Sequence, residues 1–476
     1  MPYFLLPRGI FVETCHLNFS NATIGFFGDL RLQKRGQKLF SQLCKSMVMN
    51  IRGFTQSRGD EVATFRFLGN PNVTKEELEL SAAKKTDDNC KNARHVLIVN
   101  DTCEITYPTQ QKKKVGFGAT THRETLGFFI HPNLVLDADS EEILGLAGVK
   151  VWKRIGKKEE GEWDYKEKAI EEKESYKWIE SHQRANNYLG NELKKTFVTD
   201  RESDVYEYMS MVIDAGNYFV VRSGQERNLG TKESLSEHVT SKKEIGIIEL
   251  DLAANRYRKG GRVKLRVKSG SLAISKPKRK SKTFYPNELR VNFIDVEEIG
   301  VRKGKEKIHW RLLTNHPVDG LERKIINYYK LRWKVELIFA SLKKKGLMIE
   351  SSQIQSFEKM EKLIVITLLS AINIFHLISC RDGTDDKEAS LIFSKKQLEF
   401  LALLSTRILA GRSEKQKNPF PINKMSWAAW VIARLGGWKG YKSERPPGHV
   451  TFIRGLEKFH TMYEGWMLVD FSCSEV

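Results

Sequence analysis

The sequence predicts a mixed α/β fold, in which an inserted antiparallel β arm interrupts a mixed sheet and helical regions flank the sheet on both sides. Three apolar runs of strand length follow one another between residues 95 and 152, and their short connections favour antiparallel neighbours. Two later apolar strands enclose a helical pattern, which is the β-α-β arrangement of a mixed sheet. Basic, β-like runs then follow before the chain becomes helical again.

The composition indicates a globular protein with a polyanionic partner. The chain has 476 residues, of which 40% are hydrophobic, so it can bury enough apolar surface to exclude wholesale disorder. Its 79 Lys and Arg residues exceed its 59 Asp and Glu residues, which gives a formal net charge of +20. Such a surplus is typical of proteins that bind nucleic acid or an anionic membrane surface.

Targeting and membrane signals are weak in this sequence. Pro2, Pro7 and Arg8 interrupt the apolar N-terminal letters before a signal-peptide core forms, so we do not expect secretion. The most apolar segment, Leu363–Ile378, includes polar residues and is shorter than the roughly 20 residues that span a bilayer, which favours a buried helix. The six cysteines show no CxxC or paired zinc spacing. We therefore expect a cytoplasmic protein with reduced thiols and no membrane partner.

The first region, from about Asn21 to Cys90, is predicted to be helical and to bind DNA. Leu32, Leu39 and Leu43 recur at helical spacing, and basic residues lie between and beside them. A basic surface helix is often merely solvated. Few acids lie near this one, however, which favours contact with phosphates.

The predicted sheet and its helices follow in order from residue 95. Three antiparallel strands are expected at HVLIVNDT from His95, GFFIHPNLVLDA from Gly127 and EILGLAGVKVW from Glu142. A charged helix is expected through Trp178 to Lys195, followed by the strand TFVTD, the helix DVYEYMSMVIDAG and the strand YFVVRS. These last two strands and the helix between them form the expected crossover.

The inserted β arm spans about residues 224–307 and carries much of the positive charge. Between Asp251 and Lys282 the chain has twelve Lys or Arg residues and one acid, a surplus of +11. The run RVKLRVKSG from Arg262 alternates basic and apolar residues and predicts a strand with one basic face, whereas KPKRKSK from Lys276 is typical of a disordered loop. Beyond residue 319 the pattern is mainly helical.

Three acidic residues stand where a catalytic site can form. Asp101 and Asp200 each end an apolar strand, and strand ends are where ligands gather in open α/β sheets. Either residue alone is more typical of a turn or a helix cap. A predicted helix over 327–345 places four polar side chains within an arc of about 60°, namely Tyr329, Arg332, Glu336 and Lys343. A charged stripe is also typical of a solvent-exposed helix face, so Glu336 becomes a candidate because of the two aspartates.

Three carboxylates in a basic protein suit a hard divalent cation. Carboxylate oxygens favour Mg²⁺ or Mn²⁺, and the positive surface attracts a polyanion. Two such ions about 3.5–4 Å apart can activate a water or a 3′-hydroxyl and stabilise the leaving oxygen of a phosphodiester. No GxSxG, Walker A or HExxH motif offers a competing chemistry. The sequence therefore predicts two Mg²⁺ or Mn²⁺ ions at Asp101, Asp200 and Glu336, with nuclease or strand-transfer chemistry.

These motifs resemble those of the bacterial cut-and-paste DDE transposases, in particular the group that mobilises the kanamycin transposon called transposon five. The helix over 327–345 carries that group's Y-x2-R-x3-E-x6-K signature, and NDTCEITY and TDRESD resemble the segments of its two catalytic aspartates. Further similar segments occur in the same order: TFRFLGNPNV with Arg66, YFVVRS with Arg222, HWRLLTNHPV with Trp310, and WAAWVIARLGG from Trp427. The similarity extends from about residue 24 to about residue 460.

The resemblance implies a ribonuclease-H-like catalytic core and a division into three parts. These are an N-terminal helical DNA-binding domain over 1–90, a catalytic domain over 91–345 that includes the β arm, and a C-terminal helical dimerisation domain over 346–476. The resemblance also implies that Asp101, Asp200 and Glu336 are catalytic and hold the metal ions. The DNA-binding residues that it implies are Arg66, Arg222, Trp310, Tyr329, Arg332 and Lys343, with Trp310 stacking near a flipped base.

The activity implied is cut-and-paste transposition in a bacterial cytoplasm, on the nucleoid. A homodimer would pair two transposon ends on double-stranded DNA, cleave them through a hairpin intermediate and transfer the 3′ ends into target DNA. Two alternatives stay open: a non-catalytic DNA-binding derivative that regulates transposition, and a metal-dependent nuclease that never joins strands. The first twenty or so residues do not resemble the family, and Ala340 stands where the best-known member has a basic residue.

Overall fold

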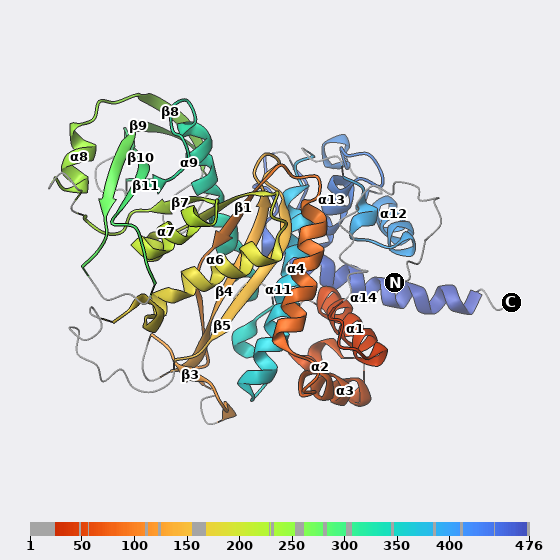
Figure 1. The fold of residues 1–476 in the computed structure, drawn as a ribbon. Helices are drawn as coiled ribbons and strands as arrows, with labels where there is room; N and C mark the ends of the chain where they lie inside the picture. The colour runs from red at the N-terminus through yellow and green to blue at the C-terminus, as the bar shows by residue number, and fades with distance from the viewer. Residues whose placement is uncertain are drawn as a thin grey trace, which may run out of the picture. The chain divides into compact units, whose positions relative to one another are not determined.

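The computed structural model divides the chain into two compact units, one formed by Ile24–Ile372 and the other including Asn373–Val476, and each is described by itself (Figure 1). The residues that the structure describes are 24–46, 49–55, 57–109, 113–121, 125–154, 168–227, 229, 233–252, 261–278, 283–300, 307–343, 347–383, 387–409, 413–441 and 443–473. The first twenty-three residues and most of the basic run after Lys276 lie outside these ranges. The predicted domain boundaries at residues 90 and 345 stay predictions.

The described residues between Ile24 and Cys90 are mainly helical, as predicted. Its helices are α1 (Leu30–Ser46), α2 (Ile51–Phe54), α3 (Arg58–Leu68) and α4 (Lys75–Cys90). Ser57 begins α3 and Thr74 begins α4, because each side-chain oxygen accepts a backbone N–H from the first turn of its helix. Leu39 and Leu43 are fully buried, as the helical spacing predicted.

The basic face of α1 is partly neutralised by an acid that the local sequence did not indicate. Arg35 Nη1 lies 2.6 Å and Lys38 Nζ 2.9 Å from Asp60 Oδ1 on α3. Burial raises the pKa of the Asp60 carboxyl, but hydrogen bonds from Lys38, Gln42 and Arg35 outweigh it and lower that pKa well below its usual value. Two cations of this basic face therefore also hold α1 against α3.

Eleven strands form one mixed sheet within the described residues, which confirms a mixed α/β protein with a large sheet and flanking helices. The strands are β1 (His95–Asn100), β2 (Cys103–Thr106), β3 (Gly118–Ala119), β4 (Leu126–Asp137), β5 (Ile143–Trp152), β6 (Lys194–Thr199), β7 (Tyr218–Arg222), β8 (Gly246–Leu252), β9 (Gly261–Ser275), β10 (Glu288–Glu298) and β11 (His309–Thr314). Their order is β2-β4-β1-β6-β7-β11-β10-β9-β8, with β3 and β5 also pairing with β4. This arrangement is consistent with a ribonuclease-H-like fold.

The directions of the central strands agree with the sequence pattern. β1, β4 and β5 are antiparallel neighbours, while β1 pairs with β6 and β6 with β7 in parallel. The crossover before β6 includes α6 (Lys177–Tyr188), and the crossover from β6 to β7 is α7 (Tyr206–Asp214). Parallel strands require such connections because their ends lie at opposite edges of the sheet.

Helices cover both faces of the central strands. In Figure 1, α4, α6 and α7 lie over the sheet, and their apolar side chains share one buried core with Val96, Ile98, Phe197 and Phe219. Side chains alternate along a strand, so Leu97 faces the opposite side. There α9 (Glu322–Leu331) contacts β6 and β7, and α10 (Trp333–Leu342) contacts β1.

Two predicted helices have different bounds in the structure. The helix expected through Lys195 ends at Tyr188, because a turn at Gly190 separates it from β6, which begins at Lys194. The helix expected over 327–345 is two helices, since α9 ends at Leu331 and α10 begins at Trp333. Arg332 lies at that junction, and its N–H bonds to the carbonyl of Tyr329 instead of the carbonyl four residues back.

The inserted arm is antiparallel and continues the central sheet. β8, β9, β10 and β11 pair in sequence order, and α8 (Leu235–Ser241) is a short capped helix before them. The predicted basic strand is β9, whose basic residues partly pair with acids: Arg262 with Glu249 and Asp251, and Arg266 with Glu244 and Glu297. These acids neutralise part of the positive charge, so the surface of the arm is less positive than the local count of basic residues indicates.

The remaining chain is helical, as predicted beyond residue 319. Its helices are α11 (Phe357–Ser379), α12 (Lys395–Leu409), α13 (Met425–Leu435) and α14 (His449–Cys473). Short 3-10 turns occur at η3 (Ile170–Glu172), η4 (Glu174–Tyr176), η5 (Arg201–Ser203), η6 (Ile349–Ser351), η7 (Ala389–Leu391) and η8 (Glu414–Gln416). Among the described residues, α11 alone has the length and apolar composition to cross a membrane, but 94% of its most apolar stretch is buried in the protein, which is typical of a core helix.

A group of buried histidines lies where β1, β6 and α9 meet. The Oγ1 of Thr196 lies 2.7 Å from Nε2 of His95 and 2.8 Å from Nε2 of His316. Burial, with a smaller contribution from neighbouring cations, lowers the pKa of His95 to about 4 and that of His316 to about 3. Burial also lowers the pKa of His182, on α6, to about 4. These three rings are therefore neutral in the folded protein near neutral pH.

Acidification from about pH 6.5 to about pH 4 is expected to destabilise the unit Ile24–Ile372. The unfolded chain binds a proton at each histidine near pH 6.5, whereas the folded protein binds it only at lower pH. The stability is thus fully present above about pH 6.5 and falls towards the folded-state pKa, by about 1–3 kcal/mol for each histidine. Urea-unfolding midpoints across this range measure the loss. His316→Gln keeps a hydrogen-bonding group beside Thr196 but does not titrate, so an unchanged pH slope in this variant would contradict the assignment.

Candidate active site

Two of the predicted carboxylates lie together because their strands are parallel neighbours. β1 and β6 pair with Val99 opposite Val198, so Asp101 and Asp200 leave the sheet at the same edge. The apolar residues before them are buried in the core, whereas the two carboxylates are partly exposed at the rim. Asp101 is further fixed by the N–H of Thr102, which donates to its Oδ1 at 2.7 Å.

The third acid, Glu336, reaches the same place from α10, and all three contact one guanidinium. Arg332 Nη1 lies 2.7 Å from Asp101 Oδ2, and Arg332 Nη2 lies 2.8 Å from Glu336 Oε1 and 3.7 Å from Asp200 Oδ2. The side chain of Arg332 is only 9% exposed. The structure therefore brings together the three acids that the sequence singled out, around a cation from the same signature.

Burial strengthens the electrostatic interactions among these charged side chains, because their surroundings screen charge less than water does. Burial raises the pKa of Asp101 and of Glu336, and the neighbouring carboxylates add to the rise while Arg332 opposes it. Burial lowers the pKa of Arg332, but its attraction to Tyr329 and the three carboxylates outweighs burial and raises it overall. Negative charge gathered in such surroundings favours the binding of further positive charge.

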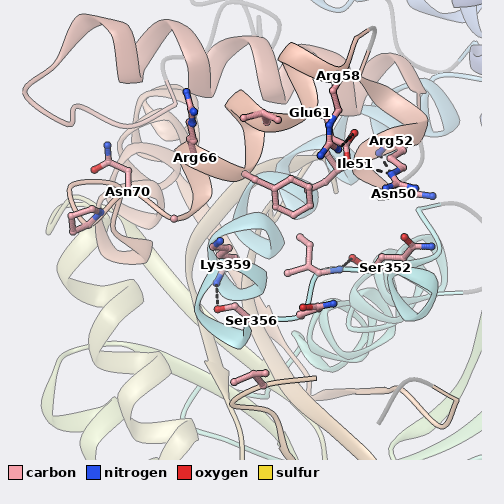
Figure 2. Close-up of a pocket in the computed structure, with 18 residues that line it drawn as sticks. Asn50, Ile51, Arg52, Arg58, Glu61, Arg66, Asn70, Ser352, Ser356 and Lys359 are labelled. Atoms are coloured by element: carbon pink, nitrogen blue, oxygen red, sulfur yellow. Dashed lines mark hydrogen bonds and ion pairs between the residues drawn. The ribbon is translucent and has the colours of Figure 1, made fainter. Parts of the chain in front are cut away.

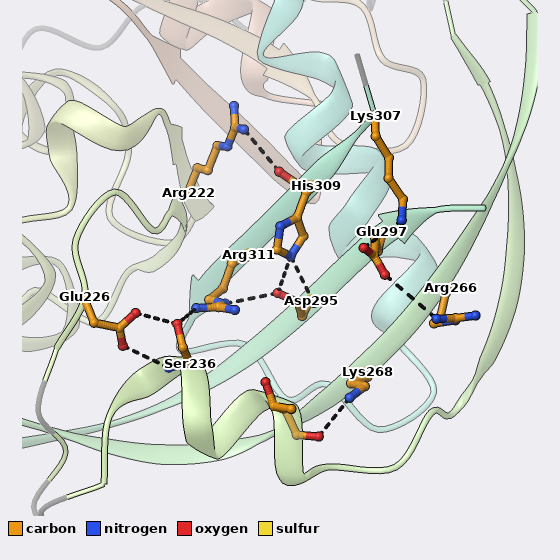
Figure 3. Close-up of polar contacts among 11 residues, drawn as sticks. Arg222, Glu226, Ser236, Arg266, Lys268, Asp295, Glu297, Lys307, His309 and Arg311 are labelled. Carbon is orange, nitrogen blue, oxygen red and sulfur yellow. Dashed lines mark hydrogen bonds and ion pairs between the residues drawn. The ribbon is translucent and has the colours of Figure 1, made fainter. Parts of the chain in front are cut away.

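Tyr329 connects the acids to Trp310. Its hydroxyl donates to Asp200 Oδ1 at 3.2 Å, and its ring meets the Trp310 ring edge to face with centroids 5.1 Å apart. Burial raises the pKa of Tyr329 to about 12, so the hydroxyl stays protonated and able to donate. Arg222, at the end of β7, donates from Nη2 to the carbonyl of His309 at 3.1 Å, directly before Trp310 (Figure 3). Of the predicted DNA-binding residues, Tyr329 thus contacts an acid directly, while Trp310 and Arg222 adjoin Tyr329.

The opposite face of β11 is held by a polar network that the sequence did not reveal. Asp295 on β10 accepts hydrogen bonds from His309 Nε2 and Arg311 Nε, both at 3.0 Å (Figure 3). Arg311 Nη1 also donates to Ser236 Oγ on α8 at 2.9 Å. Because side chains alternate along a strand, these contacts fix the strand from the side opposite Trp310. Only the paired strands, and not any local motif, bring these residues together.

Two other predicted DNA-binding residues lie elsewhere. Lys343 stands at the end of α10 with its Nζ 4.0 Å from Glu350 Oε1, and no contact that the structure gives for it reaches the three acids. Arg66 on α3 lines a pocket of about 1070 Å³ between the N-terminal helices and the segment before α11 (Figure 2). Arg52, Arg58 and Lys359 also line this pocket, and Glu61 pairs with both arginines, so the lining keeps a net positive charge.

Asp204 is a structural residue, which the sequence alone does not distinguish from the other acids of the TDRESD block. It follows Asp200 in the TDRESD block, and its carboxylate is fully buried. Asp204 Oδ2 accepts from the N–H groups of Gly224 at 2.9 Å and Gln225 at 3.1 Å, and Oδ1 pairs with Arg227. Asp204 therefore shapes the loop that follows β7 and Arg222. In the sequence, the sign that Asp204 has a role is the recurrence of acids within the TDRESD block.

The acids fit a divalent metal by the chemistry of their oxygens. Asp101, Asp200 and Glu336 supply carboxylates and no soft ligand, as Mg²⁺ or Mn²⁺ prefers. In the part of the chain that the structure describes, no three His, Cys, Asp or Glu side chains are grouped closely enough to form a ready metal site. The three carboxylates instead face the guanidinium of Arg332, which lies among them.

A comparison with protein families gives a match over part of this chain. Residues 179–374 match the family model described as Transposase DDE domain. The matched residues include Asp200, Arg332 and Glu336. Asp101 lies before the matched region in the sequence, but the pairing of β1 with β6 places it beside Asp200. A DDE transposase domain implies DNA transposase activity with DNA as the partner, and enzymes with this domain generally use divalent metal ions.

Proposed function

We propose that this protein is a cut-and-paste DNA transposase of the group with the Y-R-E-K signature, similar to the transposase of the kanamycin transposon. It binds the ends of its transposon, cleaves them through a hairpin intermediate and transfers the 3′ ends into target DNA. It acts as a homodimer on the nucleoid in the bacterial cytoplasm, with residues 1–90 binding DNA and 346–476 contributing to dimerisation. The observation that carries the proposal is the convergence of Asp101, Asp200 and Glu336 on one guanidinium at the edge of the sheet.

The three acids are the proposed ligands of two Mg²⁺ or Mn²⁺ ions. When bound, such ions supply an activated oxygen nucleophile and neutralise the leaving oxygen of the phosphodiester. Asp101 is held by the N–H of Thr102, and Asp200 by the hydroxyl of Tyr329, so both carboxylates are oriented by neighbours within hydrogen-bond distance. Fixed orientation lowers the reorganisation that the site needs during the reaction.

The basic and aromatic residues around the acids are the proposed DNA contacts. Arg222 and Arg332 present cations that can pair with phosphates beside the break, and Lys343, farther from the acids at the end of α10, can pair with a phosphate of the flanking DNA. Trp310 presents an aromatic ring next to Tyr329, where a displaced base can stack. Arg66 belongs to the separate basic pocket of Figure 2, which suits the contact of a second stretch of the same DNA.

Cleavage of a labelled duplex that carries the inverted repeats flanking this gene tests the proposal. We expect Mg²⁺-dependent nicks, hairpin ends and joined products. Glu336→Ala should remove all three, whereas Glu322→Ala, an acid of α9 outside the site, should leave them unchanged. Cleavage that survives Glu336→Ala would refute the site. Binding without cleavage would favour a regulatory derivative, and cleavage without hairpin or joined products would favour a simple nuclease.

Binding to DNA is expected to weaken steeply with salt, because phosphate contacts release counterions. The slope of log affinity against log salt is about −0.9 for each neutralised phosphate, so six contacts cost about 10³-fold between about 50 and 200 mM salt. Fluorescence anisotropy across this range measures the slope. Arg66→Gln should make the slope less negative by about 0.9, whereas Lys91→Gln, a surface cation paired with Asp88, should not change it. A flat response in the wild type would contradict a phosphate-dominated interface.

A further inference from the structure

The three carboxylates of the site are held together by Arg332 and not by contact with one another. Each carboxylate comes from a different segment, namely the end of β1, the end of β6 and the first turn of α10. The distances from the guanidinium are 2.7 Å to Asp101, 2.8 Å to Glu336 and 3.7 Å to Asp200. Three carboxylates gathered around one guanidinium repel one another, so a shared cation is needed to keep them close.

Only an arginine can make these contacts at once. Its guanidinium is a planar fork with donors pointing in several directions, whereas the ammonium of lysine is a single point charge. Arg332 reaches the centre because it lies at the junction of α9 and α10, where its side chain is 9% exposed. Arg332 and Glu336 are also one helical turn apart, so they can pair without any change in the backbone.

A divalent cation and Arg332 compete for the same oxygens. Asp101 Oδ2 and Glu336 Oε1 are the atoms nearest to the guanidinium, and carboxylate oxygens are what Mg²⁺ or Mn²⁺ requires. Two cations that share these atoms repel each other strongly in buried surroundings. Metal ions can therefore enter only at the cost of loosening Arg332, unless another anion takes up the guanidinium. A DNA phosphate is such an anion, because it accepts the same bidentate fork.

We infer that Arg332 is a positioning residue that passes from the carboxylates to a DNA phosphate when DNA enters, so that metal ions load with DNA and not before it. This inference rests on the proposed function, since it assumes that the acids bind metal and that DNA reaches them. Because coupling between two ligands is reciprocal, the metal must strengthen DNA binding by the same factor by which DNA strengthens metal binding.

The first test is Mn²⁺ binding to the full chain without DNA, measured by electron paramagnetic resonance of the free ion. Arg332→Gln should bind Mn²⁺ about tenfold more tightly than the wild type, since it removes the competing charge and keeps a hydrogen-bonding side chain. Arg332→Lys, which keeps the charge but not the fork, should lie between the two. Arg323→Gln, an exposed arginine on α9 whose Nη2 contacts the carbonyl of Glu249, is the matched control and should bind like the wild type. A merely structural role for Arg332 predicts the opposite sign, weaker binding in Arg332→Gln.

The second test repeats the Mn²⁺ titration with a pre-cleaved duplex that ends at the cleavage position, so that no bond is broken during the measurement. In the wild type the duplex should tighten Mn²⁺ binding about tenfold, and in Arg332→Gln it should produce little further gain. Equal gains in both proteins, or no tightening in Arg332→Gln without DNA, would overturn the inference. Failure of the proposed function has a different result: Asp101→Asn and Glu336→Gln would then leave Mn²⁺ binding unchanged.

Discussion

Asp101→Asn is expected to lower the rate of DNA cleavage by about 10⁴-fold while leaving the affinity for end DNA nearly unchanged. Asparagine has the shape of aspartate and still accepts the N–H of Thr102, which donates to Oδ1 at 2.7 Å. It lacks the negative charge that a divalent cation requires, and it lacks the charge that pairs with Arg332 at 2.7 Å. The fold is therefore preserved while the proposed metal site loses one ligand. Single-turnover cleavage and anisotropy with the same duplex measure the two quantities.

Asp139→Asn is the matched control for this variant. Asp139 is exposed, follows β4 and forms a surface ion pair with Lys324 at 3.4 Å, so the cleavage rate of Asp139→Asn should equal that of the wild type. If Asp101→Asn lost DNA binding and cleavage to the same degree, Asp101 would be structural. If it kept cleavage, the metal site would not include this residue.

The central part of the fold follows from local sequence because burial and local pattern agree there. The strands that end near Asp101 and Asp200 are short, apolar and bounded by polar residues, and the structure has them within a residue or two of the predicted positions. Their parallel pairing was not predicted, because further strands as well as α6 lie between them in the sequence. What the sequence indicated was that each aspartate ends an apolar strand, where side chains of an α/β sheet can converge.

The contacts between distant segments were not predictable in the same way. Glu336 and Arg332 share a predicted helix, but the break at Arg332 that turns its side chain towards the acids has no proline or glycine to signal it. The network of Asp295, His309 and Arg311 depends on the register of β10 with β11, where Asp295 lies opposite Arg311. Periodicity indicates which face a residue occupies but not which strand lies beside it.

Asp204→Ala is expected to destabilise the unit Ile24–Ile372 by about 3–5 kcal/mol, because it leaves a buried arginine without its counter-ion. The Asp204 side chain is fully buried and that of Arg227 is 10% exposed. The substitution also removes the acceptor of two backbone N–H groups, those of Gly224 at 2.9 Å and Gln225 at 3.1 Å. Each N–H left unpaired in a buried place costs free energy in addition to the loss of the ion pair.

The measurement for Asp204 is the midpoint of urea unfolding, followed by tryptophan fluorescence. Asp204→Asn keeps an acceptor for the loop but not the charge, so its midpoint should lie between those of Asp204→Ala and the wild type. Asp214→Ala, at the exposed end of α7, should unfold like the wild type. A midpoint of Asp204→Ala equal to that of the wild type would show that Arg227 and the loop find other partners. In that case Asp204 would not fix the position of Arg222. Any loss of cleavage in this variant would then have to come from altered contacts with DNA and not from an altered fold.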